Sequence, residues 1–312
     1  MTHPSPSAPL KIGTRGSPLA LAQAHETRER IAAAFDLPPE AFEIVVISTT
    51  GDRVQDRPLK EIGGKGLFTR EIEAALLSGA IDIAVHSMKD MPVLQPEGLV
   101  LDCYLPREDV RDAFVAPGLA GLDDLAEGAV VGTSSLRRKA QVLHRRPDLK
   151  VVEFRGNVQT RLRKLADGVA QATFLAMAGL NRLNAGDVPR VPVDPGQMLP
   201  AIAQGAIGIE RRQGDRAVAA LLEPVHDAAT GQRLAAERAL LAGLDGSCET
   251  PIAGLAELDG GTLRLRGEIL RTDGSEALSD AVSGAVADGA EMGRAMAAGL
   301  LARAGDGFFD WK

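Results

Sequence analysis

The feature that most constrains the fold of this chain is a regular alternation of short apolar runs with amphipathic runs, which starts at Leu10. The short runs are rich in Val and Ile and are typical of buried β-strands, whereas the amphipathic runs have helical spacing. Ser17 followed by Pro18 is typical of a helix start, with Ser as the N-cap and Pro at the first helical position. Alternating strands and helices predict mostly parallel sheets with helices on both faces.

The alternation occurs in two series, and a different pattern follows them. The first series predicts strands at 10–14, 42–48 and 81–85 and helices at about 18–35 and 68–77. The second predicts strands at 129–131, 151–154 and 172–176 and helices at 134–145 and 158–166, then an irregular Pro-rich crossover at 188–200, a strand at 206–210 and a helix at 232–242. Beyond Pro251, strands at 252–257 and 263–270, a Gly260-Gly261 turn and a helix at 285–304 predict a small α+β domain.

Composition argues against several classes of protein. The net charge is -7, whereas attraction to nucleic acid or an anionic membrane needs a basic surface, and 3% aromatic residues leave few side chains for stacking on bases. No run approaches 18 apolar residues, so we expect no membrane span. Two cysteines do not form a disulfide framework, and residues 1–9 lack the apolar core of a signal peptide, so we expect a cytoplasmic protein.

A polar motif follows the apolar run 81–85 and reads His86-Ser87-Met88-Lys89-Asp90. Ligands of open α/β sheets bind just beyond the carboxyl ends of the strands. Lys89 and Asp90 are therefore candidates for charge stabilisation and proton transfer. The alternative is a solvated Lys–Asp pair at a strand exit.

A second motif, Thr133-Ser134-Ser135-Leu136-Arg137-Arg138, places three hydroxyls and two cations at the start of a predicted helix. The N-terminus of a helix favours anions, through its free N–H groups and its dipole. The hydroxyl run alone is also explained by helix capping. Two arginines in the first turn oppose the dipole, which indicates an anionic partner such as a carboxylate or phosphate.

Arginine recurs at other predicted junctions between strand and helix. Arg15 follows the first strand, Arg155 ends a strand in the second series, Arg161 lies on the next helix, and Arg182 follows the apolar stretch 174–180. A single arginine at a strand end is usually a surface residue. Repeated at several junctions, the guanidiniums would converge on one cleft if the two series face each other, and the ligand would carry many carboxylates.

Two further segments are candidates for function. Residues 51–66 are polar and end in Gly63-Gly64-Lys65-Gly66, which predicts a lid, with a plain surface loop as the alternative. Cys248 lies in a loop bounded by Gly246 and Pro251. A loop cysteine can be reactive, although on chemistry alone an unreactive one is the simpler interpretation, and with only five scattered histidines we expect no zinc site. Cys103, in an apolar stretch, is expected to be a core residue.

Taken together, these segments resemble the hydroxymethylbilane synthase (porphobilinogen deaminase) family. The resemblance runs in order through nearly the whole chain and rests on these segments: 12–20, 63–68, 85–92, 111–114, 132–138, 154–161, 204–206 and 246–251. It implies a transferase of porphyrin and heme biosynthesis that joins four porphobilinogen molecules head to tail, with loss of ammonia at each step. The chain grows on a dipyrromethane primer bound to Cys248 through a thioether and is then hydrolysed off as hydroxymethylbilane.

The resemblance also implies roles for individual residues. Asp90 would be the catalytic acid, assisting loss of the amino group and stabilising the resulting cation. The residues that would hold the acetate and propionate carboxylates are Arg15, Ser17, Ser87, Lys89, Thr133, Ser134, Ser135, Arg137, Arg138, Arg155, Arg161 and Arg182.

The implied fold is α/β: two doubly wound domains like those of periplasmic binding proteins, joined by crossovers, plus a small α+β C-terminal domain. The predicted domains are 10–105 with 203–227, then 106–202, then 228–312, and the implied oligomeric state is a monomer. Two departures from the family pattern are Ser247, where many members have Gly, and Ala203, where Gly is common.

Two other functions remain open on sequence grounds. One is a ligand-binding protein of the same architecture that performs no chemistry, which the Cys248 loop disfavours. The other is a regulatory or nucleic-acid-binding module, which the negative charge disfavours.

Overall fold

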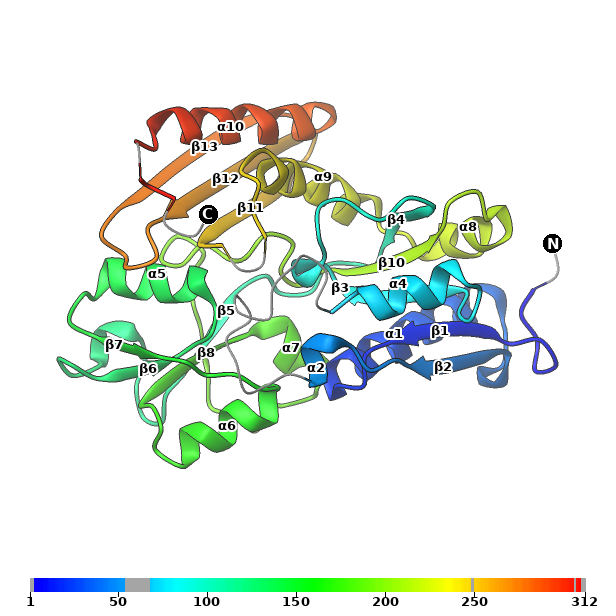
Figure 1. Ribbon diagram of the computed structural model, residues 1–312, viewed down its shortest axis with the longest axis horizontal. Helices are drawn as coiled ribbons and strands as arrows, with labels where there is room; N and C mark the ends of the chain where they lie inside the picture. The colour runs from blue at the N-terminus through cyan, green and yellow to red at the C-terminus, as the bar shows by residue number, and fades with distance from the viewer. Residues whose placement is uncertain (1–2, 54–67, 248–249, 306, 310–312) are drawn as a thin grey trace. The chain divides into compact units, whose positions relative to one another are not determined.

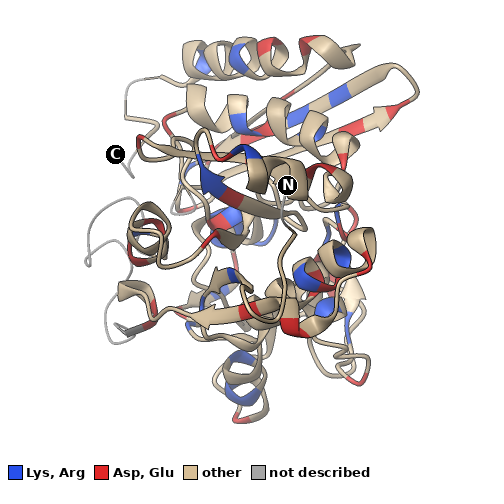
Figure 2. Cartoon of the chain, turned by 90° about the vertical axis from the view of Figure 1, so that its right-hand side faces the viewer, with Lys and Arg blue, Asp and Glu red and all other residues tan. Residues whose placement is uncertain are grey.

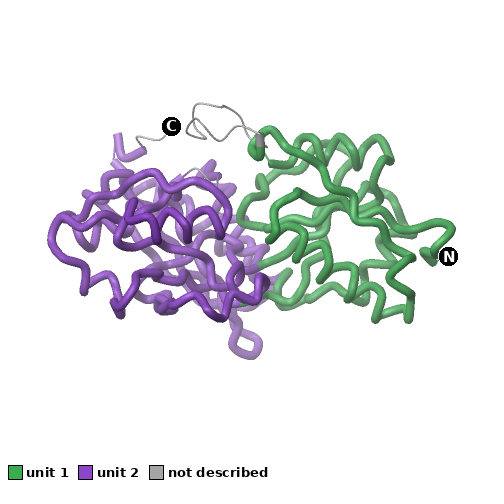
Figure 3. The backbone as a smooth tube through the Cα atoms, turned by 90° about the horizontal axis from the view of Figure 1, so that it is seen from below, with its two compact units in different colours: residues 1–108, 206–231 green, residues 109–205, 232–312 purple. Residues whose placement is uncertain are grey.

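The computed structural model describes residues 3–53, 68–247, 250–305 and 307–309. Figure 1 shows their helices and strands. The chain divides into two compact units, Met1–Glu108 with Ala206–Gly231 and Asp109–Gly205 with Gln232–Lys312 (Figure 3). In the described residues, no helix is long and apolar enough to cross a membrane.

The first unit contains a five-stranded sheet with the strand order β2-β1-β3-β10-β4. Strands β1, β2 and β3 are parallel, and β10 runs antiparallel to β3 and β4. The strands are β1 (Leu10–Thr14), β2 (Phe42–Val46), β3 (Ile83–Ser87), β4 (Leu99–Tyr104) and β10 (Ile207–Arg212), and the helices are α1 (Pro18–Phe35), α2 (Thr50–Arg53), α4 (Arg70–Leu77) and α8 (Arg216–Leu222).

Helices cover both faces of this sheet because alternate residues of its strands point in opposite directions. Ile83 and Val85 of β3 belong to a core shared with Ile31 of α1, whereas Ala84, between them, packs with Ile72 of α4. The predicted doubly wound arrangement is therefore confirmed for this unit.

The second unit repeats the arrangement with the strand order β7-β6-β8-β5-β9. Phe114 and Phe174 pack with Val142 of α5 on one face, and Val115 and Leu175 pack on the other. The strands are β5 (Asp112–Val115), β6 (Val130–Gly132), β7 (Lys150–Val152), β8 (Ala172–Ala176) and β9 (Val191–Pro192), and the helices are α5 (Leu136–Arg145), α6 (Val158–Ala166) and α7 (Met177–Arg182).

Each sheet receives an antiparallel strand, fourth in the strand order, through a crossover of the chain. β10 enters the first sheet after the chain has passed through the second, and β5 enters the second directly after the chain has left the first. Two doubly wound sheets with crossovers were predicted, and this prediction is confirmed.

The second unit also contains a three-stranded antiparallel sheet, β11-β12-β13, close to the C-terminus. Helices α9 and α10 lie on one side of it (Figure 1), and Gly293 of α10 allows their close contact, because a Cβ there would lie 2.3 Å from the Ala236 carbonyl oxygen. The elements are α9 (Ala228–Gly243), β11 (Ile252–Asp259), β12 (Thr262–Leu270), β13 (Ala277–Ala285) and α10 (Gly289–Arg303). This is the predicted small α+β region; the division of the chain into three domains stays a prediction.

The two departures from the family pattern have different consequences. Ser247 is not among the residues with positive φ, so its side chain imposes no left-handed strain. Ala203, by contrast, has φ of 60°, a conformation that costs a non-Gly residue roughly 1–2 kcal/mol. Its backbone N–H donates to the carboxylate of Glu237 at 2.7 Å, which helps hold the strained turn.

Candidate active site

In the first unit, the residues that follow β1 and β3 meet at one edge of the sheet, because the two strands are parallel. Arg15 follows β1, and Ser17 caps α1 by accepting a hydrogen bond from the Ala20 N–H at 3.2 Å. Ser87 ends β3, and Asp90 lies in the short 3-10 helix η2 (Met88–Asp90).

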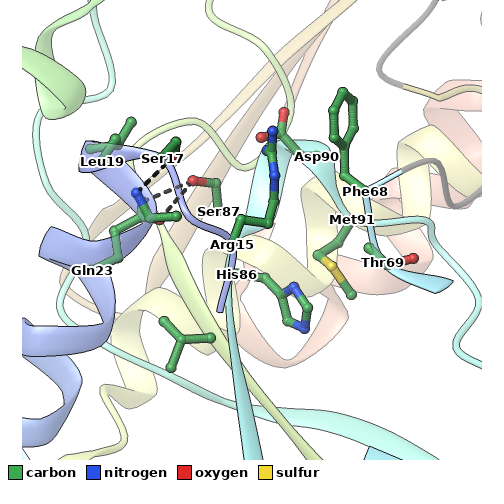
Figure 4. A pocket seen from close by; sticks show the side chains of 12 residues that line it. Arg15, Ser17, Leu19, Gln23, Phe68, Thr69, His86, Ser87, Asp90 and Met91 are labelled. Atoms are coloured by element: carbon green, nitrogen blue, oxygen red, sulfur yellow. Dashed lines mark hydrogen bonds between the residues drawn. The ribbon is translucent and has the colours of Figure 1, made fainter. Parts of the chain in front are cut away.

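These four residues line a single pocket (Figure 4). The structure thus brings together four of the predicted site residues of this unit. The fifth, Lys89, is next to Asp90 on η2 but is not among the described residues that line the pocket.

The pocket contains a residue that sequence reasoning missed. Gln23 is buried on α1, and its amide exchanges two hydrogen bonds with the Ser87 hydroxyl, at 2.8 and 3.0 Å, which fixes the position of that hydroxyl. The signal was present in the sequence: Gln23 lies six residues beyond the Ser17 cap, on the face of α1 that also carries buried Thr27 and Ile31.

Arg15 already has an anionic partner in its own chain. Its guanidinium forms a salt bridge with Asp52 of α2 and lies over the ring of Phe68, 4.2 Å from the ring centroid. Burial raises the pKa of Asp52, but Arg15 and the hydrogen bonds from Thr49 outweigh burial and lower it. Asp52 belongs to the predicted lid, of which residues 54–66 lie outside the described residues.

In the second unit, the hydroxyl motif after β6 makes local contacts. The hydroxyl of Ser135 accepts from the Arg138 N–H at 3.4 Å, that of Thr133 accepts from the Ser135 N–H at 3.2 Å, and that of Ser134 accepts from the Phe154 N–H at 3.0 Å. Capping thus accounts for part of the motif, as the alternative interpretation held.

The two arginines of this motif are buried and share one carboxylate. Arg137 donates to Asp112 at 2.8 Å and Arg138 donates to it at 2.7 Å. Burial raises the pKa of Asp112, but the two guanidiniums outweigh burial and hold it well below its usual range. The anionic partner expected from the helix dipole therefore includes a residue of this chain, which sequence reasoning missed because Asp112 is 25 residues away.

In the cluster of Arg137, Arg138 and Asp112, neither the charges nor the hydrogen-bond donors are fully matched. Two guanidiniums face one Asp112 carboxylate, and the buried Nε of Arg137 has no hydrogen-bond partner in the described residues. Gln141 connects the cluster to the C-terminal sheet, since it accepts from Arg137 at 3.0 Å and donates to Glu268 of β12 at 2.8 Å. Burial raises the pKa of Glu268.

Of the remaining predicted arginines, one lies in a loop and two lie on helices. Arg155 follows β7, which is parallel to β6, so it lies at the same sheet edge as the hydroxyl motif. Arg161 on α6 donates to the Gly156 carbonyl at 2.9 Å, and Arg182 at the end of α7 donates to the Gly205 carbonyl at 3.1 Å. The carboxylate-binding roles of all these residues stay predictions.

The structure describes one of the two cysteines, Cys103. Cys248 lies outside the described residues, although the adjacent Ser247 N–H donates to the Thr250 hydroxyl at 3.0 Å. Cys103 is buried in the core, as predicted, and burial raises the pKa of its thiol to about 12. Such a thiol is unreactive at neutral pH.

Elsewhere in the chain, basic and acidic residues are interspersed (Figure 2). Several of them pair, as Arg211 does with Asp102 in the first unit and Arg145 with Asp123 in the second.

The fold and these sites define a class: a protein of two crossover-linked α/β units whose strand ends gather arginines, hydroxyls and a carboxyl group, an arrangement suited to anionic ligands. Two family models match the chain. "Porphobilinogen deaminase, dipyromethane cofactor binding domain" covers residues 10–220, and "Porphobilinogen deaminase, C-terminal domain" covers 232–302. The chain belongs to the porphobilinogen deaminase family.

The relatives found by sequence and those found by structure differ widely in their sequence identity to this chain. The porphobilinogen deaminase of Paracoccus denitrificans is 67% identical over 308 residues, which is 99% of this chain and 98% of that protein. A periplasmic substrate-binding protein of an ABC transporter from Coxiella burnetii is 14% identical over 71% of this chain and 93% of its own, with a TM-score of 0.40. A BvgS VFT2 domain of Bordetella pertussis is 18% identical over 69% of this chain and 85% of its own, with a TM-score of 0.38.

Proposed function

We propose that this chain is a porphobilinogen deaminase that joins four porphobilinogen molecules and releases hydroxymethylbilane. The observation that carries the proposal is the pocket of the first unit, where Asp90, Arg15 and two hydroxyls lie together in a chain 67% identical to a porphobilinogen deaminase. We further infer that the protein works as a cytoplasmic monomer, an inference that rests on the family resemblance.

The dipyrromethane cofactor fits the residues present. It carries four carboxylates, two on each pyrrole, and the buried pair Arg137 and Arg138 exceeds its internal carboxylate by one positive charge. The Nε of Arg137, which has no hydrogen-bond partner among the residues that the structure describes, is a further donor in the same place. We assign the attachment to Cys248, because Cys103 is buried and its thiol pKa is raised. When bound, the cofactor supplies the terminal pyrrole to which the first substrate adds.

The chain's own residues would act on the substrate by charge and position. Arginine guanidiniums in a low-dielectric site bind acetate and propionate groups more strongly than they would in water. Asp90 would assist departure of the amino group and stabilise the cation that forms, which is the kind of electrostatic stabilisation that often dominates catalysis. Gln23 would fix the position of the Ser87 hydroxyl beside the ligand.

Incubation of the purified protein with porphobilinogen tests the activity. We expect one ammonia released for each porphobilinogen consumed, with hydroxymethylbilane as the product. Retention of porphobilinogen without release of ammonia would instead identify a binding protein of the same architecture.

A further inference from the structure

A histidine and two carboxyl groups are buried together beside the pocket of the first unit. His86 of β3 is 6% exposed, Glu210 of β10 is fully buried, and Glu73 of α4 is 8% exposed. His86 Nε2 lies 3.2 Å from Glu210 Oε2, across the antiparallel pair of β3 and β10. Burying three ionisable groups costs stability, so a cluster of this kind at a pocket suggests a functional role.

The pair formed by His86 and Glu210 leaves one nitrogen of the ring for other contacts. Because a carboxylate only accepts hydrogen bonds, Nε2 donates to Glu210, and this selects the tautomer in which Nδ1 is the proton acceptor. Within the described part of the chain, Nδ1 has no hydrogen-bond partner. The fully buried polar atoms that lack a partner do not include Nδ1, so this nitrogen is not completely buried. His86 lines the pocket together with Ser87 and Asp90 (Figure 4).

The surroundings of the pair are suited to holding a proton. Burial raises the pKa of Glu73, and the charge of Glu210 raises it further, while His86 acts in the opposite direction. A buried carboxylate that faces an imidazole also stabilises the imidazolium, as in catalytic triads. The cluster can therefore accept a proton without placing a new isolated charge in the core.

Each addition of porphobilinogen must dispose of a proton as well as ammonia. The bond between the aminomethyl carbon and nitrogen breaks, and ammonia leaves with the electron pair. The free α-carbon of the preceding pyrrole forms the new carbon–carbon bond. The hydrogen on that α-carbon then leaves as a proton, and the C–H electrons return to the ring.

We propose that His86 accepts this α-proton at Nδ1 and that Glu210 is the positioning residue that fixes its tautomer. The inference rests on the proposed function. In this scheme Asp90 assists departure of the amino group and stabilises the cation, whereas His86 takes the α-proton and passes it to water. General base catalysis of this kind contributes roughly 100-fold or more.

His86→Gln tests the proposal, because the amide nitrogen of Gln can keep the bond to Glu210 while the basic nitrogen is lost. We expect kcat to fall about 100-fold, with little change in KM or Tm. With porphobilinogen deuterated at its free α-position, the variant should show a larger primary isotope effect than the wild type, because proton loss has become rate-limiting. Glu210→Gln should raise the isotope effect in the same way, and His3→Asn, near the N-terminus, should leave it unchanged.

Other outcomes would overturn the inference. A His86→Gln variant with kcat near that of the wild type excludes the proposed base. A variant with reduced kcat but an unaltered isotope effect would give His86 a structural role only. If His86→Gln does not fold, the isotope effect of Glu210→Gln decides alone. Absence of ammonia release by the wild type would contradict the proposed function itself and so is distinguishable from failure of this inference.

Discussion

Replacing Asp90 by Ala is expected to lower kcat about 100-fold or more, while the protein stays folded. Asp90 lies on η2 at the edge of the pocket, so its loss removes a charge from the site without opening the core. Steady-state release of ammonia from porphobilinogen measures the effect, and thermal unfolding checks the fold. Asp90→Asn should be nearly as inactive, since the charge and the exchangeable proton are both lost.

A matched control is Asp102→Asn, which removes a carboxylate of the same unit that pairs with Arg211 away from the pocket. We expect it to have near-normal activity. Near-normal activity in Asp90→Ala would show that Asp90 is not the acid–base group.

Replacing Asp112 by Asn is expected to have the largest effect on stability. Asp112 is fully buried and is the carboxylate shared by Arg137 and Arg138, so its loss leaves two buried guanidiniums without that counter-charge. Breaking a buried pair in this way costs about 3–5 kcal/mol of unfolding free energy. For a chain of this size the melting temperature should fall by roughly 10 °C.

The control for this change is a carboxylate that pairs with the same helix, α5. Asp123 pairs with Arg145 of α5 at an exposed position, and Asp123→Asn should change the melting temperature little, because exposed salt bridges contribute less than about 1 kcal/mol. A melting temperature for Asp112→Asn within a degree or two of the wild type would contradict the described geometry.

The stabilising effect of Asp112 also has a defined pH dependence. Its folded pKa is depressed, so its contribution is fully present above the unfolded value of about 3.9 and is lost as pH falls toward the folded value. We expect the free energy of unfolding of the wild type to decrease in this acid range. In Asp112→Asn, the part of this decrease that comes from protonation of Asp112 should be absent.

Sequence reasoning predicted the fold where the pattern was local and strongly apolar. The strand at Leu10–Thr14, the cap at Ser17 and the helix Val158–Ala166 match the structure residue for residue. Four strands were missed, among them the two-residue β9, which lies in the predicted irregular crossover. β4 and β5 lie outside the recognised alternation, and β13 is a sheet edge whose residues 279–283 are all exposed, so no apolar alternation marks it.

For the site, sequence reasoning located positions but not partners. It placed Arg15, Ser17, Ser87 and Asp90 at strand ends, and the structure gathers them in one pocket. It did not find Gln23, Asp52 or Asp112, because their contacts with Ser87, Arg15 and Arg137 span 25–64 residues and depend on tertiary packing. The resemblance to a family supplied what spacing could not, namely roles for Asp90 and Cys248.

The central claim, that Cys248 carries a dipyrromethane, is tested most directly by intact-mass spectrometry of the wild type, Cys248→Ser and Cys103→Ser, each after incubation with porphobilinogen. We predict that the wild type exceeds its sequence mass by at least two condensed porphobilinogen units. Cys103→Ser should keep the adduct, because that thiol is buried with a pKa raised to about 12, and Cys248→Ser should lack it. An unmodified wild type, or an adduct that persists in Cys248→Ser, would contradict the account.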